Sequence, residues 1–241
     1  MDAIFRNIWP YTSVVGKPDN LFTPTANQEY QLGARYQYGG WTFHYAYAGG
    51  VALVPGYLCY STSSPVEKDK AVGTAAAIGA TYIPNITTAA AQLYLEGGKL
   101  CVNDNGGEGT SYLIERSAAN ASTATSTDVW LYDPLRVALT TSSQVELFTS
   151  KYYDIDVMNG VNALAVGVPL MAVTANYYFW ICTWGEVSVL NGGTTVAGEA
   201  IIPHTDGSVI PCTAVTEQVV GKGVSGGTAT EFNTVEIRLA P

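Results

Sequence analysis

The feature that most constrains this chain is the regular recurrence of short apolar and aromatic runs between turn residues. Such runs return roughly every eight to twelve residues, and no helical period extends beyond a turn or two. Residues 28–38 and 41–47 are an example, because they flank a Gly39-Gly40 pair that can supply the positive φ of a tight hairpin. The pattern predicts an all-β protein built of antiparallel β-sandwich or barrel units, with an extended N-terminal arm.

Three later runs strengthen this expectation. Residues 177–184 are so rich in aromatic side chains that we expect both faces of the strand to be covered. Residues 143–149 alternate polar and apolar side chains in their first half, and residues 234–239 do so throughout, as half-buried strands do. We divide the chain into an arm and hairpin (1–47), a middle β region (48–140) and a C-terminal sandwich or barrel (141–241). No internal repeat of fixed period is visible.

Residues 1–27 are expected to form the arm, because they hold three prolines and no hydrophobic period. Such a segment cannot fold alone, and its large apolar side chains need a surface to lie on. That surface is either the protein's own body or a neighbouring subunit. The side chains concerned are Ile4, Phe5, Ile8, Trp9 and Phe22.

Charge is sparse in this chain. Lys and Arg number 11 and Asp and Glu 20, so only 13% of the residues are charged and the net charge is −9. An acidic chain is repelled by phosphate, so nucleic acid is not an expected partner, and no basic cluster could hold an anionic membrane. Since interface cores are depleted in charge, we expect part of the surface to be buried against other chains.

The N-terminus has no secretory signal pattern, and the four cysteines, none in a CxxC pair, are expected to be reduced thiols. Residues 71–95 and 157–185 carry no charge and are long enough to cross a bilayer. Both contain Pro, Gly and Asn at depths where lipid would penalise them, so we expect each to form buried strands with turns between them.

Two glycine-rich patterns share one stretch near the C-terminus. Residues 221–226 match GxGxxG, and residues 223–227 match GxSxG. The first pattern needs a strand before it and a helix after it, and the second needs a histidine later in the chain. His44 and His204 both come earlier, so we expect a hairpin loop here, and neither a dinucleotide site nor a nucleophile elbow.

Other polar groups favour ordinary loops. His204 and Asp206 are expected to be solvated. The turn with Asp104, Asn105 and Glu108 has few ligands for calcium, although binding there stays open. Asp154 and Asp156 flank Ile155 and would share one exposed face of a strand. We therefore predict no catalytic residue, no metal site, no cofactor and no enzymatic activity.

The 16 tyrosines and five tryptophans suit either sugar stacking or subunit contacts. Because residues 177–184 lie in a charge-free segment, core or interface is favoured. The predicted interface residues are Ile4, Phe5, Ile8, Trp9, Phe22, Tyr178 and Trp184.

Two parts of the chain resemble virion proteins of tailed bacteriophages. One is the run Val166–Gly185, in which a strand of small residues precedes an aromatic strand ending in Trp-Gly. The other combines Tyr94–Asn103 with Gly106–Ile114 and Leu131–Leu135. The resemblance covers roughly residues 50–241 and consists of structural strands and turns. It implies an all-β head protein that decorates or cements a capsid.

The resulting expectation is a capsid decoration protein of the virion, assembled in the host cytoplasm. Its expected partners are the major capsid protein and copies of itself, as a homo-oligomer and for instance a trimer, without nucleic acid or membrane. A tail or head–tail component, or the shell subunit itself, is the first alternative. A carbohydrate-binding β-sandwich for host attachment is the second.

Overall fold

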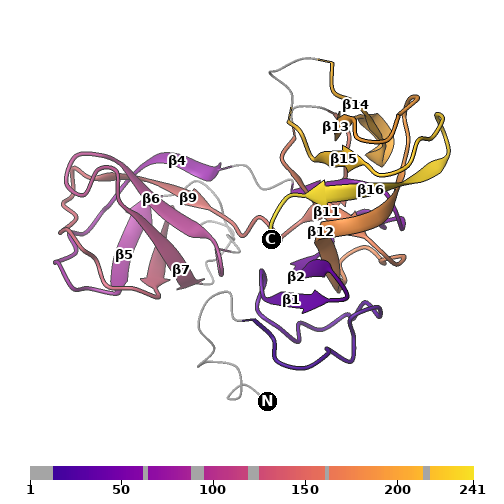
Figure 1. Cartoon of the computed structure of the whole chain (residues 1–241). Coiled ribbons are helices and arrows are strands. Elements are labelled where there is room, and N and C mark those ends of the chain that lie inside the picture. Colours follow the sequence, from indigo (N-terminus) through magenta and orange to yellow (C-terminus); the bar gives the residue numbers. More distant parts are fainter. Residues whose placement is uncertain (1–12, 62–64, 88–94, 119–124, 161–162, 214–217) are drawn as a thin grey trace. The chain divides into compact units, whose positions relative to one another are not determined.

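The computed structural model describes residues 13–61, 65–87, 95–118, 125–160, 163–213 and 218–241. These contain sixteen β-strands and a single 3₁₀ turn, η1 (Thr205–Gly207), and all pairings between named strands are antiparallel (Figure 1). The predicted all-β class with antiparallel sheets is therefore confirmed. Residues 1–12 of the expected arm lie outside the described residues.

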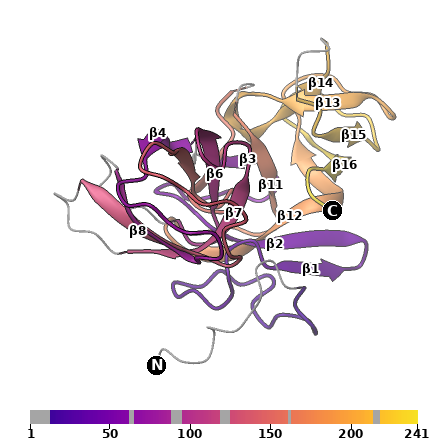
Figure 2. The ribbon, with the colours of Figure 1, turned by 90° about the vertical axis from the view of Figure 1, so that its left-hand side faces the viewer.

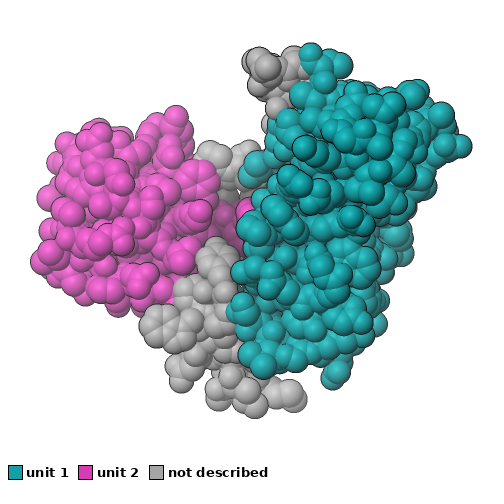
Figure 3. Space-filling view, in the orientation of Figure 1, with its two compact units in different colours: residues 1–62, 152–241 teal, residues 63–151 magenta. Residues whose placement is uncertain are grey.

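The chain forms two compact units (Figure 3). Unit 1 consists of residues 1–62 and 152–241, and unit 2 of residues 63–151. Unit 2 is thus inserted into the sequence of unit 1. These limits do not coincide with the segments 1–47, 48–140 and 141–241 that the sequence suggested, because strands from both ends of the chain share one sheet in unit 1.

Unit 2 is a curled sheet of six strands in the order β4-β9-β6-β7-β8-β5. An isolated bridge between Val72 and Ile86 connects the two edge strands of this order. Its core contains Ile83, Leu100, Val129 and Val145, all of them fully buried. The six strands are β4 (Pro65–Ala71), β5 (Tyr82–Thr87), β6 (Lys99–Asp104), β7 (Ser111–Ser117), β8 (Ser126–Leu131) and β9 (Gln144–Phe148).

Unit 1 contains one sheet of ten strands, in the order β10-β3-β11-β12-β16-β15-β13-β14, with β2 on β12 and β1 on β2. The strands are β1 (Arg35–Tyr38), β2 (Trp41–Tyr47), β3 (Cys59–Ser61), β10 (Ile155–Val157), β11 (Ala165–Pro169), β12 (Tyr178–Leu190), β13 (Ala200–Pro203), β14 (Val209–Pro211), β15 (Gly221–Gly223) and β16 (Phe232–Arg238).

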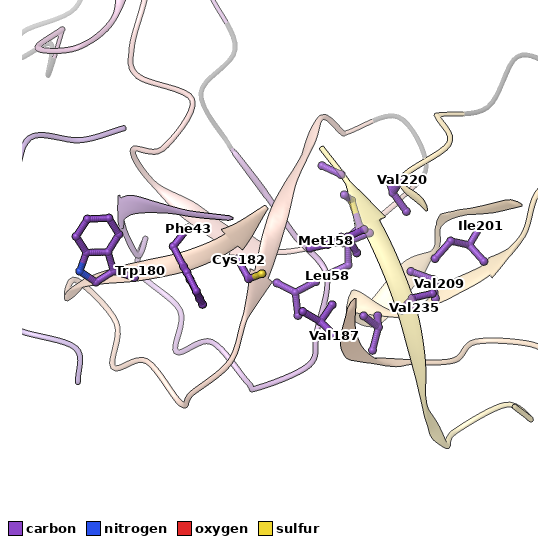
Figure 4. Packing of buried hydrophobic residues seen from close by; sticks show 14 of the residues in the cluster. Phe43, Leu58, Met158, Trp180, Cys182, Val187, Ile201, Val209, Val220 and Val235 are labelled. Carbon is purple, nitrogen blue, oxygen red and sulfur yellow. The ribbon is translucent and has the colours of Figure 1, made fainter. Parts of the chain in front are cut away.

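Strand β12 organises unit 1. It is 13 residues long, and it pairs with β2 through its first half and with β16 through its second half (Figure 2). Residues 179–183 are buried on both faces of the sheet, as predicted for this aromatic run. Trp180 and Cys182 belong to one core cluster, which continues through Val187 and Val235 (Figure 4), whereas Phe179 and Ile181 belong to another.

The predicted hairpin is present in part. Tyr38 pairs with Trp41 across Gly39 and Gly40, whose φ angles are 58° and 90°, so the tight turn is confirmed. Strand β1 begins only at Arg35, however, so the strand expected from residue 28 is shorter. Residues 28–32 instead run across the aromatic face of β2, where the N–H of Glu29 donates to the hydroxyl of Tyr45, and only Gly33 and Ala34 keep backbone hydrogen bonds to β2.

One type of turn recurs in both units. Three isolated antiparallel bridges each join two such turns: Leu53 with Val173, Ala76 with Leu139, and Thr195 with Gly227. In all six turns, the N–H of the residue four positions after the bridge residue donates to the carbonyl of the residue that directly follows the bridge residue. We name these three arrangements turn pairs. In five of the six turns the third position after the bridge residue has a positive φ, the mark of a type II turn. The five residues are Gly56, Gly79, Asn176, Gly198 and Thr230.

Two of the three turn pairs have an approximate twofold relation in these hydrogen bonds, and in the third only Gly79 follows it, by donating to Leu135. The N–H of Gly198 donates to Gly223, four residues before the partner bridge residue, and Thr230 donates to Asn191 in the same way. Gly56 and Asn176 repeat the relation with Pro169 and Gly49. The sequence spacing between the two members differs from pair to pair, so no fixed period marks them.

Within the part of the chain that the structure describes, no helix has the length and apolar character that a membrane crossing requires. The described portions of 71–95 and 157–185 contain β5, β11 and most of β12, joined by turns, as expected.

Candidate functional site

An aromatic face on β1, β2 and β12 is the most distinctive surface of unit 1. Alternate residues of β2 point to this face, and the register sets Tyr47 opposite Tyr178 and Tyr45 opposite Trp180. Residues 13–34, which we name the strap, cover the centre of the face. Leu21 of the strap is buried there, and the indole Nε1 of Trp180 donates to Oδ1 of Asn20 at 3.1 Å.

Phe22 of the strap packs edge-on against Phe43, with 6.0 Å between ring centroids, yet it remains 42% exposed. The ammonium of Lys17 lies 5.8 Å from the Phe22 ring and 5.4 Å from that of Tyr38. This predicted interface residue thus contacts its own body and still offers an outer surface. The predicted contacts of Ile4, Phe5, Ile8 and Trp9 lie outside the described residues.

Tyr178 and Trp184 lie at opposite ends of the segment of β12 that pairs with β2. The Tyr178 ring is stacked on Tyr45 at 5.9 Å and tilted against Tyr47 at 4.8 Å. Trp184 is half-buried where β12 passes from pairing with β2 to pairing with β16. Sugar stacking needs an open ring face, and the neighbouring tyrosines occupy much of the surface of Tyr178.

A second aromatic group, not expected from the sequence, crosses the outer face of unit 2. Tyr82 and Arg116 both pair with Trp130 across neighbouring strands. The guanidinium carbon of Arg116 lies 3.7 Å from the Trp130 ring centroid. The Tyr82 hydroxyl donates to Asp128 at 2.8 Å, and this hydrogen bond raises the pKa of Tyr82. Both sides of Trp130 are thus in contact, which is typical of a cross-strand ladder that stabilises a sheet.

The turn pairs expose apolar side chains, which the sequence analysis also missed. In the turn pair of unit 2, Ile78 is 68% exposed, and Val137, two residues before the bridge residue Leu139, is 42% exposed. Val196, 58% exposed, and Val224 belong to the pair joined by Thr195 and Gly227, and Val54 to the pair joined by Leu53 and Val173. Of these residues only Ile78 directly precedes a positive-φ position, Gly79, and no pattern in the sequence marks the group.

The histidines lie in separate settings. His44 is buried, stacks on Tyr152 with 4.7 Å between centroids, and bonds the hydroxyl of Thr183 through Nδ1 at 3.0 Å. His204 precedes η1, where its Nδ1 lies 3.2 Å from the Ser208 hydroxyl. The glycine-rich stretch forms β15 and the loop before β16, so the predicted hairpin is confirmed and no helix follows it.

Acidic groups are dispersed in the portion of the chain that the structure describes, where no three metal-ligating side chains gather. In the Asp104 turn, Oδ1 of Asp104 accepts the N–H of Asn105, and Asn105 Nδ2 donates to Ser142. The prediction that Asp154 and Asp156 share a strand face is wrong. Asp154 has a φ of 58°, so the backbone bends there and β10 begins only at Ile155.

Comparison of the chain with family models, curated proteins and solved structures finds no match in any of the three.

Proposed function

We propose that this protein is a structural component of a tailed-bacteriophage particle, a decoration or cement protein bound to the outside of the head lattice. The observation that carries the proposal is the exposure of apolar side chains on ordered turns of an all-β chain with only 13% charged residues. Apolar side chains fixed on turns need little ordering when they bind, which favours association. The resemblance to virion proteins in residues 166–185 supports the same assignment.

In this role the protein stabilises the lattice by burying apolar area against neighbouring subunits. Ile78 and Val196 are suited to such contacts because each stands on a turn held by backbone hydrogen bonds. The net charge of −9 suits the outer face of a shell better than the side facing the genome. The major capsid protein and further copies of this chain are the proposed partners.

The test compares particles with and without the protein. Particles that lack it should lose integrity at lower temperature or at lower salt, and adding the purified protein back should restore the resistance. When added to particles that lack the protein, the double variant Ile78→Ser, Val196→Ser should bind in smaller amounts than the unaltered protein. The variant Thr228→Ser, on an exposed turn position, is the matched control and should bind normally. Equal stability with and without the protein would contradict the proposal.

A tail or head–tail role is the closest alternative, and the number of copies per particle separates the two. Hundreds of copies would place the protein in the head as decoration or shell subunit, and a few dozen would place it in the tail. Host-glycan binding is the other alternative. It predicts a signal on a glycan array that disappears with Trp184→Ala and persists with Tyr38→Ala.

A further inference from the structure

The chain contains three Asn-Gly pairs, at Asn105-Gly106, Asn159-Gly160 and Asn191-Gly192. Asparagine followed by glycine is prone to spontaneous deamidation, because no side chain hinders the next backbone nitrogen. The reaction also requires local freedom, since that nitrogen must reach the side-chain carbon of the asparagine. The surroundings of the three pairs differ greatly in this respect.

Asn191-Gly192 is held most firmly. Asn191 is 1% exposed, and its Oδ1 accepts a hydrogen bond from the hydroxyl of Thr195. The attacking nitrogen of this pair would be that of Gly192, and its N–H already donates to the carbonyl of Val209 at 2.9 Å. Deamidation of Asn191 would therefore require the backbone hydrogen bond between Gly192 and Val209 to break first.

Asn105-Gly106 is exposed but well tied. Asn105 Nδ2 donates to Ser142 at 2.8 Å, its carbonyl accepts from Glu108 at 2.9 Å, and its N–H donates to Asp104. The carbonyl of Gly106 accepts the Ser143 hydroxyl at 2.8 Å. The turn is therefore fixed on both sides of the bond that would have to rotate.

Asn159-Gly160 is different. Asn159 is exposed, and its single recorded hydrogen bond within the described chain runs from Nδ2 to the hydroxyl of Tyr60 at 3.0 Å. No backbone hydrogen bond of Asn159 or Gly160 to another described residue is recorded, and a Cβ on Gly160 would meet no atom within 4 Å. Few backbone hydrogen bonds and open surroundings mark a segment with local freedom.

We infer that Asn159 is a site of spontaneous deamidation in the folded protein, and that Asn105 and Asn191 are protected. The backbone nitrogen of Gly160 attacks Cγ of Asn159 and forms a C–N bond that closes a succinimide ring. The side-chain nitrogen leaves as ammonia, carrying the proton that Gly160 loses. Water then opens the ring at either carbonyl and gives aspartate or isoaspartate.

The modification would change the surroundings of β10. The product carboxylate cannot donate to the Tyr60 hydroxyl as the amide did. It also adds a negative charge next to the pair that Asp156 forms with Tyr60 across β10 and β3. This inference does not depend on a role in a particle.

The test is a time course of the full chain in mildly alkaline buffer, followed by proteolysis and mass spectrometry of the three peptides. In the folded protein, Asn159 should lose its amide several-fold faster than Asn105 and Asn191, with isoaspartate among the products. In denaturant, the three rates should converge, because the protection of Asn105 and Asn191 comes from the fold.

The variant Gly160→Ala provides the control, because an added methyl group hinders the attacking nitrogen and has room in the structure. It should slow the reaction at Asn159 and leave the rates at the other two sites unchanged. Equal rates at Asn105 and Asn159 in the folded protein would overturn the inference. So would an intact Asn159 under conditions in which the denatured chain reacts.

Discussion

At the scale of single residues, Gly227 shows how tightly the turn pairs are packed. It lies between the buried side chains of Asn191 and Asn233, and Asn233 Nδ2 donates to Thr195 and to the carbonyl of Ser225, both at 3.0 Å. A Cβ at position 227 would collide with Asn191 Nδ2 and approach Asn233 Cβ to 3.0 Å. Neither side chain can retreat without breaking its hydrogen bonds.

We therefore expect Gly227→Ala to lower the free energy of unfolding of unit 1 by about 1–3 kcal/mol, the usual cost of overpacking. The matched control is Gly193→Ala, whose Cβ would meet atoms no closer than 3.5 Å, and it should change stability little. Chemical denaturation of both variants checks this. A loss as large for Gly193→Ala would contradict the steric explanation.

The thiols give a second prediction at this scale. Burial raises the pKa of Cys182 to about 12, and burial together with the nearby Asp156 raises the pKa of Cys59. Since the thiolate is the reactive form, both should resist alkylation in the folded protein near pH 8. Cys101 and Cys212 are half-exposed and should react first. Mass spectrometry after brief labelling, with and without denaturant, would show modification of Cys59 and Cys182 only after unfolding.

At the scale of elements, the type II turn is the recurring unit, and Thr230 is its exception. The other four positive-φ positions are glycine or asparagine, whereas Thr230 holds a φ of 72° with a β-branched side chain. Such a residue in the left-handed region costs about 1–3 kcal/mol.

Thr230→Gly should therefore raise the stability of unit 1 by up to about 1 kcal/mol, because relief of this strain exceeds the roughly 0.5–1 kcal/mol entropic cost of glycine. Thr228→Gly, two positions earlier and without positive φ, should lower stability. Thermal unfolding of the two variants gives the comparison, and a loss in both would show that the backbone at Thr230 is not strained.

Elements with local causes could be predicted from the sequence. The Gly39-Gly40 hairpin follows from glycine at positive φ, and β16 and β9 follow from the period of two in their side chains. The turn pairs could not be predicted, because their partners lie far apart at unequal spacings and share backbone angles more than residue types. The strand expected at 28–34 is not formed, because the Tyr45 side chain holds Glu29 on the face of β2, and only Gly33 and Ala34 bond to the backbone of β2.

The residues of the candidate surface also differ in how far they could be predicted from the sequence. Phe22 could be proposed from its apolar side chain alone, whereas its contact with Phe43 depends on the path of the strap. Exposure of Ile78 and Val196 could not be foreseen, since an apolar residue between strands is usually expected to be buried.

At the scale of the whole molecule, the two units have separate cores. Among the residues that the structure describes, the core cluster of unit 2 runs from Val72 to Leu147 and shares no member with the two clusters of unit 1. A large-to-small substitution in one core should therefore act mainly on its own unit.

Leu100→Ala should destabilise unit 2 by about 2–5 kcal/mol, the usual cost of such a cavity. Amide hydrogen exchange should then accelerate in β6, β7 and β9 and change little in β12 and β16. Val235→Ala should show the reverse. Acceleration spread evenly over both units after Leu100→Ala would mean that the whole chain unfolds as one cooperative system.

The insertion of unit 2 also determines an order of events during synthesis. Trp41–Tyr47 leaves the ribosome long before its partner strand at residues 178–184 has been made. The six strands of unit 2 lie between residues 65 and 148 and pair only with one another, so all of them have been made by then. The nascent chain must therefore carry a strongly aromatic strand, paired with β1 alone on one edge, through the translation of more than half its length. Exposed strands of this kind aggregate readily, so the yield of native protein should depend on how quickly elongation delivers that late partner.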